Sequence, residues 1–344
     1  MITQIIPKRI FCCIGISQEC IFKCKMCFFW KNKYERTEQE PTLQEWYNFI
    51  SLLADLGENT VEINLAGGEP LLDERNLKLV DFAAKKGVYT SLSSNGFLIN
   101  KEMASSIARS GLDVIGISLD GIDENTHDFL RGVQGSYDKI MKGIDHLERH
   151  CGHLTIGIQT VISDRNLDEV IRLTEWVNAH RRIRYIVFQA IEHPFNTPLD
   201  LEWHNKSEYA FLWPRDTHRV NNVIDELIRL KGSGYKITNP VSQLEIFKAY
   251  FADPGKFIKQ GKCNVSENYM NINQFGDIFL CLRKESIGNI RTFAPEEFWH
   301  SQKVDRIRKE MGKCRDNCHH LVNCCYKEEH PPLLGNEIRQ NIGN

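Results

Sequence analysis

The chain has 344 residues, with 43 Lys plus Arg against 45 Asp plus Glu, so its formal net charge is −2. This balance gives no electrostatic reason to expect a nucleic acid or a membrane surface as a partner. No apolar run approaches the roughly 20 residues that span a bilayer, and the first residues lack the order of a signal peptide. We therefore expect a cytoplasmic protein, in which the twelve cysteines favour metal ligation over disulfides.

Short β-rich runs alternate with helical patterns over the first half of the chain. The β-rich runs predict six strands, at 10–16, 61–65, 88–93, 114–119, 154–162 and 184–189. Apolar residues at helical spacing predict helices at 42–56, 76–86, 101–110, 137–149 and 167–179. Such alternation requires a parallel sheet with right-handed crossovers. We expect an α/β fold with a partial (β/α)6 TIM-like barrel.

Three cysteines follow the first predicted strand at the spacing C-x3-C-x2-C: Cys20, Cys24 and Cys27. Three thiolates on one short loop can hold three corners of a cubane iron-sulfur cluster, and no fourth ligand lies nearby, so one iron would stay open. A structural zinc site prefers four ligands in two close pairs, and a redox pair would be C-x2-C. Zinc or stray loop thiols are therefore the poorer interpretations.

Polar and glycine motifs follow the next three strands, on the side where barrels of this kind place their chemistry. After the second strand, Gly67 and Gly68 let a ligand approach the backbone and Glu69 can accept from an ammonium group. A simple strand-to-helix turn is the alternative. Ser94-Asn95-Gly96 closes the third strand, where a turn is the plainer interpretation. At the end of the fourth strand Ser118 can meet a ribose hydroxyl, and further on Arg131 can clamp a carboxylate. Taken singly, each is more often a surface residue.

The β-α pattern breaks between 193 and 236, where irregular structure precedes a helix predicted at 220–231. This segment could cap the barrel mouth. Four of its aromatic residues are read as packing residues: Trp203, Tyr209, Phe211 and Trp213.

Six further cysteines lie between 263 and 325. Cys263 and Cys281 bracket a predicted hairpin, 269–272 and 278–280, with a Gly-Asp turn, which would bring their thiols together. A helix predicted at 304–311 precedes the remaining four, Cys314, Cys318, Cys324 and Cys325. Six thiols in so short a stretch are hard to explain as packing residues.

The motifs from Cys20 to Arg131 occur in the order of the radical S-adenosylmethionine (SAM) superfamily, and the chain resembles it over about residues 10–190. The resemblance implies that Cys20, Cys24 and Cys27 ligate a 4Fe-4S cluster whose open iron binds SAM. It also implies that Gly67, Gly68 and Glu69 hold the SAM amino group. The other cofactor-binding residues that it implies are Ser94, Asn95, Ser118 (ribose) and Arg131 (carboxylate).

The C-terminal cysteines resemble those of SPASM and twitch domains, which carry auxiliary iron-sulfur clusters. The tail departs from the full SPASM pattern, because its pair is C-x3-C and no cysteine follows Cys325. A single second 4Fe-4S cluster fits better than two, with the predicted ligands Cys263, Cys281, Cys314 and Cys318 and with Cys324 as the substitute. Zinc at these residues remains an alternative.

The resemblance implies reductive cleavage of SAM to a 5'-deoxyadenosyl radical, removal of a substrate hydrogen atom and oxidation assisted by the auxiliary cluster. It suggests a peptide or protein substrate, although the 19 residues before Cys20 leave no room for a peptide-recognition domain. Alternatives are dehydrogenation or epimerisation of a small polar molecule such as an aminocyclitol or sugar. Epimerisation would result if a thiol such as Cys325 returned a hydrogen atom to the substrate radical. A non-catalytic iron-sulfur or zinc protein is a further alternative. The expected partner is a low-potential electron donor such as flavodoxin or ferredoxin.

Four regions are therefore expected. Residues 1–191 form the radical SAM core, and 192–254 connect it to the rest. Residues 255–330 form the auxiliary cluster domain, and 331–344 are a tail. Neither a catalytic base nor the net outcome of the reaction follows from the sequence.

Overall fold

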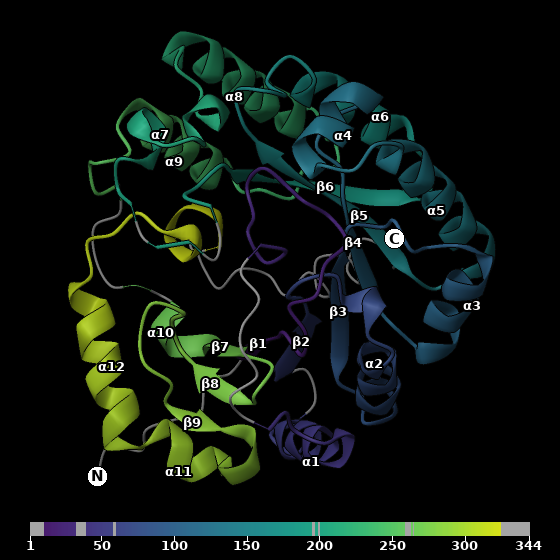
Figure 1. Cartoon of the computed structure of the whole chain (residues 1–344), viewed down its shortest axis with the longest axis vertical. Helices are drawn as coiled ribbons and strands as arrows, with labels where there is room; N and C mark the ends of the chain where they lie inside the picture. The colour runs from purple at the N-terminus through teal and green to yellow at the C-terminus, as the bar shows by residue number, and fades with distance from the viewer. Residues whose placement is uncertain are drawn as a thin grey trace.

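The computed structural model describes residues 10–31, 39–57, 60–194, 197–198, 200–258, 263 and 265–324. Within these residues a nine-stranded sheet has the order β6-β5-β4-β3-β2-β1-β7-β8-β9 (Figure 1). The first six strands are mutually parallel and form an open, partial barrel. They are β1 (Ile10–Ile14), β2 (Val61–Leu65), β3 (Tyr89–Ser94), β4 (Val114–Ser118), β5 (Thr155–Ile162) and β6 (Ile183–Ala190). The predicted fold class is confirmed.

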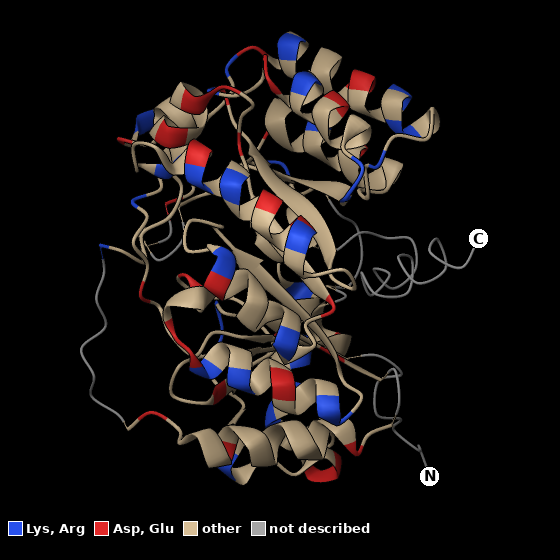
Figure 2. Cartoon of the chain, turned by 90° about the vertical axis from the view of Figure 1, so that its right-hand side faces the viewer, with Lys and Arg blue, Asp and Glu red and all other residues tan. Residues whose placement is uncertain are grey.

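Helices cover the outer face of this sheet. They are α1 (Leu43–Ala54), α2 (Arg75–Lys85), α3 (Lys101–Ser110), α4 (Glu124–Arg131), α5 (Ser136–His150) and α6 (Val170–Ala179). Lys, Arg, Asp and Glu residues recur along these helices, whereas the strands of the sheet carry few of them (Figure 2). Five of the six were predicted. The exception is α4, a short helix that Asp123 caps by accepting hydrogen bonds from the backbone N–H groups of Asn125 and Thr126.

The predicted C-terminal hairpin is present as β7 (Tyr269–Ile272) and β8 (Asp277–Phe279), followed by β9 (Gly288–Asn289). It is not a separate sheet. β7 pairs in parallel with β1, with Phe11 opposite Tyr269 and Ile14 opposite Ile272. Because an isolated hairpin is marginally stable in water, this pairing explains how so short a hairpin is held. The predicted domain boundaries stay a prediction.

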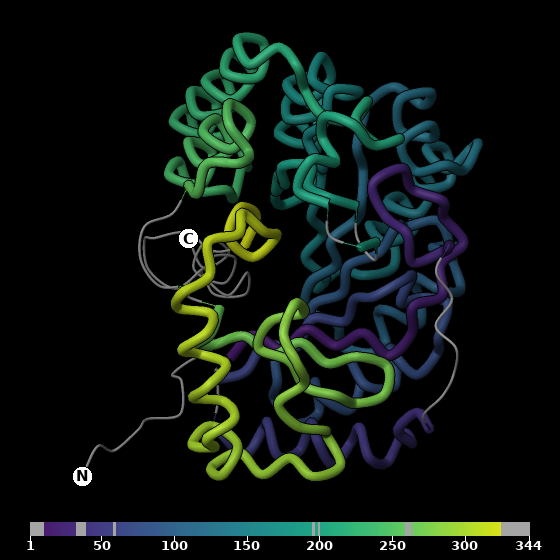
Figure 3. The backbone as a smooth tube through the Cα atoms, turned by 60° about the vertical axis from the view of Figure 1, so that its left-hand side comes forward, coloured from purple at the N-terminus to yellow at the C-terminus, as the bar shows by residue number. Residues whose placement is uncertain are grey.

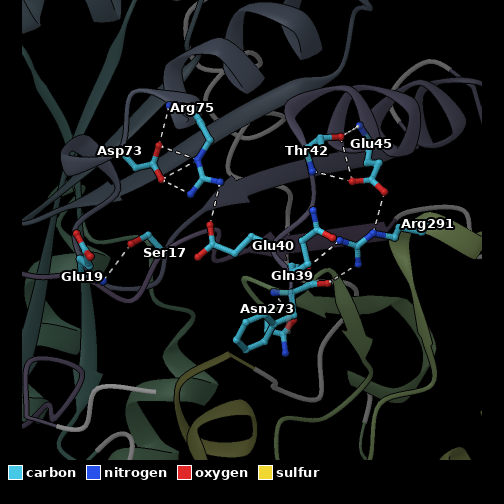
Figure 4. Close-up of polar contacts among 11 residues, drawn as sticks. Ser17, Glu19, Gln39, Glu40, Thr42, Glu45, Asp73, Arg75, Asn273 and Arg291 are labelled. Carbon is cyan, nitrogen blue, oxygen red and sulfur yellow. Dashed lines mark hydrogen bonds and ion pairs between the residues drawn. The ribbon is translucent and has the colours of Figure 1, made fainter. Parts of the chain in front are cut away.

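The same C-terminal region is fastened to α1. The Arg291 guanidinium donates to Glu45 Oε1 at 2.8 Å and to the carbonyl of Gln39 at 2.8 Å (Figure 4). Glu45 also closes the capping box of α1 with Thr42. Beside this contact, the rings of Phe49 and Phe293 pack edge to face with their centroids 5.0 Å apart. These contacts, together with the pairing of β7 with β1, join the C-terminal region to the β1 edge of the barrel.

The middle segment lies beyond β6 and is mostly helical. It contains α7 (Trp203–Lys206), η2 (Ala210–Leu212), α8 (Thr217–Gly232) and α9 (Val241–Ala252). The helix predicted at 220–231 corresponds to α8, whereas α9 was not predicted. Trp203 and Trp213 are buried and their rings meet edge to face at 5.7 Å, with Tyr250 of α9 at 5.2 Å from Trp213. For these two tryptophans, the packing interpretation is confirmed.

The last described segments are α10 (Val265–Asn268), η3 (Ile290–Thr292), α11 (Pro295–Trp299), α12 (Gln302–Lys313) and a π-helical turn, η4 (His320–Cys324). η4 lies between α9 and the hairpin (Figure 3). The Asn323 side chain accepts from the Ala190 N–H at 2.7 Å and donates to the Ala190 carbonyl at 3.0 Å. η4 therefore lies against the free edge of β6. None of the described helices is long and apolar enough to cross a membrane.

Candidate functional site

The first cavity, of about 190 Å³, opens at the carboxyl ends of the parallel strands. The loop after β1 contributes three cysteines, the β2 and β3 ends contribute the glycine and serine motifs, and β4 ends at Ser118. Nine of the ten residues predicted from the radical SAM motifs, all except Glu69, line it: Cys20, Cys24, Cys27, Gly67, Gly68, Ser94, Asn95, Ser118 and Arg131. The sheet topology brings together residues that are more than 100 positions apart in the chain.

Burial raises the pKa values of the three cysteine thiols, because it disfavours the charged thiolate. It raises the pKa of Cys20 to about 11 and that of Cys27 to about 12, and it raises the pKa of Cys24 as well. Thiols in such a site lose their protons when a metal supplies the compensating charge. Three soft sulfur donors line this cavity, and no other cysteine among the described residues does, which fits a cluster with one open iron.

Gly67 and Gly68 hold the cysteine loop. A Cβ at Gly68 would lie 2.1 Å from the Glu19 carbonyl, and a Cβ at Gly67, whose φ is +112°, would lie 2.5 Å from the Ser17 carbonyl. The Gly68 N–H also donates to that Ser17 carbonyl at 3.1 Å. The two glycines therefore allow the backbone after β2 to pack directly against the backbone of the cysteine loop, in addition to any contact with a ligand.

Glu69 is buried, and neighbouring backbone and side-chain groups occupy its carboxylate. It accepts from the Ser94 hydroxyl at 2.8 Å, from the Asn95 N–H at 2.7 Å and from the Leu71 N–H at 3.0 Å. Burial raises its pKa, which these three hydrogen bonds counteract. Glu69 does not line the cavity, so the structure gives it a positioning role that joins the β2 and β3 loops. Its predicted contact with SAM stays a prediction.

Arg131 reaches the cavity from the end of α4. Its Nε lies 2.7 Å from Asp120 Oδ2, and its guanidinium also contacts the Cys24 sulfur. Burial opposes the charged form, but Asp120 and Cys24 outweigh it, so the pKa of Arg131 is raised. Asp120 in turn accepts from the Val161 N–H at 2.9 Å. Sequence reasoning missed Asp120, although it directly follows the fourth strand.

The second cavity, of about 420 Å³, lies beside the hairpin. Four cysteines line it: Cys263, Cys281, Cys314 and Cys318. Burial raises the pKa of Cys281, and that of Cys318 to about 12. In the part of the chain that the structure describes, no three His, Cys, Asp or Glu side chains converge tightly enough for a single metal ion. Four thiols around a cavity of this size suit an iron-sulfur cluster, which is larger than one ion.

Cys324 does not line this second cavity. It is half-buried in η4 and hydrogen-bonded to His319 and His320, and its charge adds to burial in raising the pKa of Cys13 on β1. Burial would raise the pKa of Cys324, but the two histidines lower it to about 6. His319 Nδ1 in turn lies 3.3 Å from Glu192 Oε1. The geometry therefore favours the four-cysteine set without Cys324. Cys325 lies outside the described residues.

Family models match both halves of this arrangement. Residues 14–177 match the radical SAM superfamily, and residues 263–326 match the SPASM iron-sulfur cluster-binding domain. The chain carries a radical SAM domain and a SPASM domain. Its cofactors are those of the two domains: a 4Fe-4S cluster that binds SAM, SAM itself and a second iron-sulfur cluster.

The proteins that are similar to this chain in sequence are named for different activities. An "AdoMet-dependent heme synthase" of Methanosarcina barkeri is 24% identical over 81% of this chain and 79% of its own length. A "Fe-coproporphyrin III synthase" of the same organism is 31% identical over 45% of this chain and 38% of its own length. A "PqqA peptide cyclase" of Bradyrhizobium diazoefficiens is 31% identical over 37% of this chain and 32% of its own length. Two of these three matches span well under half of the relative.

Two solved structures have the same fold. "Native anSMEcpe with bound AdoMet" has a TM-score of 0.65 at 18% identity and covers 91% of this chain and 88% of its own. Streptococcus suis SuiB bound to S-adenosylmethionine has a TM-score of 0.64 at 19% identity and covers 94% of this chain and 76% of its own.

Proposed function

We propose that the chain is a radical SAM oxidoreductase or maturase that acts on a peptide or protein. When bound, the cluster and SAM supply a 5'-deoxyadenosyl radical that removes a hydrogen atom from the substrate, and the second cluster supplies an electron acceptor. The observation that carries the proposal is the convergence of the three-cysteine loop, the two glycines, Ser118 and Arg131 on one cavity.

The protein's own residues would bind and orient the cofactors. Cys20, Cys24 and Cys27 would hold the cluster, and Ser94, Asn95 and Ser118 line the space in which SAM would lie. Arg131 offers a buried cation, fixed by Asp120, to the SAM carboxylate. Cys263, Cys281, Cys314 and Cys318 would hold the auxiliary cluster.

Two relatives bear on the substrate. The peptide cyclase relative supports a peptide, and so does the structure of SuiB bound to the precursor peptide SuiA, which has the same fold. A second candidate, a carboxylate-bearing tetrapyrrole, is favoured by one observation: the heme synthase relative matches over 81% of this chain. Hydrogen-atom removal suits either substrate, because both present unactivated C–H bonds.

The partner and compartment follow from the cofactors. A low-potential one-electron carrier, such as flavodoxin or ferredoxin, would reduce the first cluster. Eleven described cysteines are free thiols, and a reducing compartment such as the cytoplasm would keep them so.

The substrate test uses the reconstituted enzyme with SAM and dithionite under anaerobic conditions. Pools of deuterated peptides and, separately, deuterated coproporphyrins are added, and 5'-deoxyadenosine is analysed by mass spectrometry. Deuterium transferred from a peptide supports the proposal. Transfer from the porphyrin alone would replace it with the tetrapyrrole function, and no SAM cleavage in any mixture would refute both.

A further inference from the structure

The loop that carries the first cluster also forms part of the protein surface. Ile21 is 37% exposed, and Lys23 is exposed between Cys20 and Cys24. The three cysteines face the cavity on the inner side of the loop. An electron that arrives from another protein therefore has a short route through the outer side of this loop.

Two groups of cation–ring contacts lie beside the loop. On one side, Lys25 Nζ lies 5.4 Å from the ring centroid of Phe129, which is 44% exposed. The Arg165 guanidinium lies 5.6 Å from the same ring and 5.4 Å from that of Phe211. Cation–π contacts of this kind fix the cations without neutralising them.

The other side of the loop has the same composition. Lys139 Nζ lies 4.0 Å above the ring of Phe97, which packs edge to face against Phe22. Lys23 directly follows Phe22 and is held by its N–H, which donates to the Arg131 carbonyl at 3.2 Å. Gly132 fits beneath it, because a Cβ there would lie 2.2 Å from the Lys23 carbonyl.

These cations have no carboxylate as an ion-pair partner in the part of the chain that the structure describes. Among the described residues, no ion pair includes Lys23, Lys25, Lys139 or Arg165. Asp164, next to Arg165, instead faces Arg219 at 3.9 Å. The carboxylates nearest in sequence to the remaining cations are Glu19 and Asp138. The surface therefore carries four cations against these two exposed carboxylates, with one exposed ring, Phe129, whereas the whole chain has a net charge of −2.

We propose that this surface, defined by Ile21, Lys23, Lys25, Phe129, Lys139 and Arg165, docks an acidic one-electron carrier protein. The inference rests on the proposed function, since only a chain with a reducible cluster needs such a partner. One electron passes from the reduced carrier to the oxidised cluster, and no bond forms or breaks. Complementary charge steers the encounter, and the exposed side chains of Phe129 and Ile21 supply the small apolar contact that is typical of transient redox complexes.

The test measures the affinity of the full-length protein for oxidised flavodoxin by calorimetry at low ionic strength. The variant Lys139→Glu with Arg165→Glu reverses two charges on either side of the loop and leaves the loop itself intact. Its control, Arg109→Glu with Lys309→Glu, makes the same charge change at exposed residues of α3 and α12. We expect the first variant to weaken binding by roughly tenfold or more, with a shallower salt dependence, and the control to match the wild type.

A second readout separates docking from chemistry. The rate of cluster reduction by reduced flavodoxin is compared with SAM cleavage driven by dithionite, which needs no docking. We expect the Lys139→Glu, Arg165→Glu variant to lose reduction by flavodoxin and to keep SAM cleavage driven by dithionite. Equal affinity in wild type, variant and control would overturn the docking proposal, and so would a parallel loss of both rates. Loss of dithionite-driven cleavage in the wild type would instead refute the proposed function.

Discussion

Arg131 and Asp120 form a buried ion pair in the wall of the first cavity, with Arg131 Nε 2.7 Å from Asp120 Oδ2. Asp120 is 1% exposed, and the Arg131 side chain is 11% exposed. The pair links the end of β4 to the end of α4, and Arg131 continues to the sulfur of Cys24. Removing one member of a buried pair leaves the other charge uncompensated, which is costly.

We therefore predict that Asp120→Asn lowers the free energy of unfolding by about 3–5 kcal/mol, measured by urea denaturation of the cluster-free protein. The control is Asp81→Asn, which breaks the exposed pair between Asp81 and Lys85 and should change stability by less than about 0.5 kcal/mol. Similar small changes in both variants would contradict the structural importance of the buried pair.

Gly68→Ala should impair binding of the first cluster. The new methyl group would lie 2.1 Å from the Glu19 carbonyl, which is backbone and can yield only by moving the cysteine loop. Iron and sulfide analysis after reconstitution should show loss of most of the first cluster's iron. In contrast, Gly152→Ala places its methyl group in open space and should retain all the iron. Full iron content in Gly68→Ala would mean that the loop does not depend on this contact.

The auxiliary ligand set predicts different effects for two cysteines. Cys281→Ser removes a thiol that lines the second cavity, whereas Cys324→Ser changes one that does not. Iron content should fall by about four per chain in Cys281→Ser and stay unchanged in Cys324→Ser. If iron were lost in Cys324→Ser and kept in Cys281→Ser, Cys324 would be a ligand of the auxiliary cluster. The conformation of η4 would then differ in the protein that contains the cluster.

His127 predicts a specific pH dependence of stability. Burial, with a smaller effect of Arg131, lowers its pKa from 6.5 to about 4. The neutral ring accepts from the Asp120 N–H through Nδ1 at 3.2 Å. Above pH 6.5 His127 is neutral in both the folded and unfolded states. As the pH falls from 6.5 towards 4, the unfolded state binds a proton that the folded state excludes, so stability is lost.

His127→Asn keeps an acceptor near the Asp120 N–H and removes the titration. Its free energy of unfolding, measured in urea at several pH values, should fall less steeply than that of the wild type between pH 6.5 and 4. Parallel curves over that interval would show that His127 titrates normally in the folded protein.

The sequence predicted the barrel because its strands and helices each carry a strong local pattern. It also predicted which motifs meet, because the carboxyl ends of parallel strands share one edge. It could not predict that β7 pairs with β1, since strand pairing between residues 11 and 269 depends on the assembled sheet. All four residues of β7 are buried, which in retrospect indicates an inner strand and not an exposed hairpin.

The functions of individual side chains were harder to predict. Gly67 and Gly68 were read as a ligand cradle, but their tightest contacts are with the backbone at Ser17 and Glu19. Glu69 was predicted to hold the SAM amino group. The structure adds three donors from its own and the neighbouring loop, and the contact with SAM stays a prediction. Cys324 fits the spacing of a ligand, yet on η4 it does not line the second cavity. Such outcomes depend on loop conformation, which motif spacing does not specify.

The two-cluster assignment is tested most directly by comparing the wild type with the triple variant Cys20→Ala/Cys24→Ala/Cys27→Ala. The quantities to measure are iron content and SAM cleavage. After anaerobic reconstitution and reduction with dithionite, the wild type should contain about eight irons per chain and convert SAM to 5'-deoxyadenosine. The triple variant should retain about four irons, held at Cys263, Cys281, Cys314 and Cys318, and form no 5'-deoxyadenosine. A wild type that binds no iron or leaves SAM intact, or a triple variant that still cleaves SAM, would contradict the assignment.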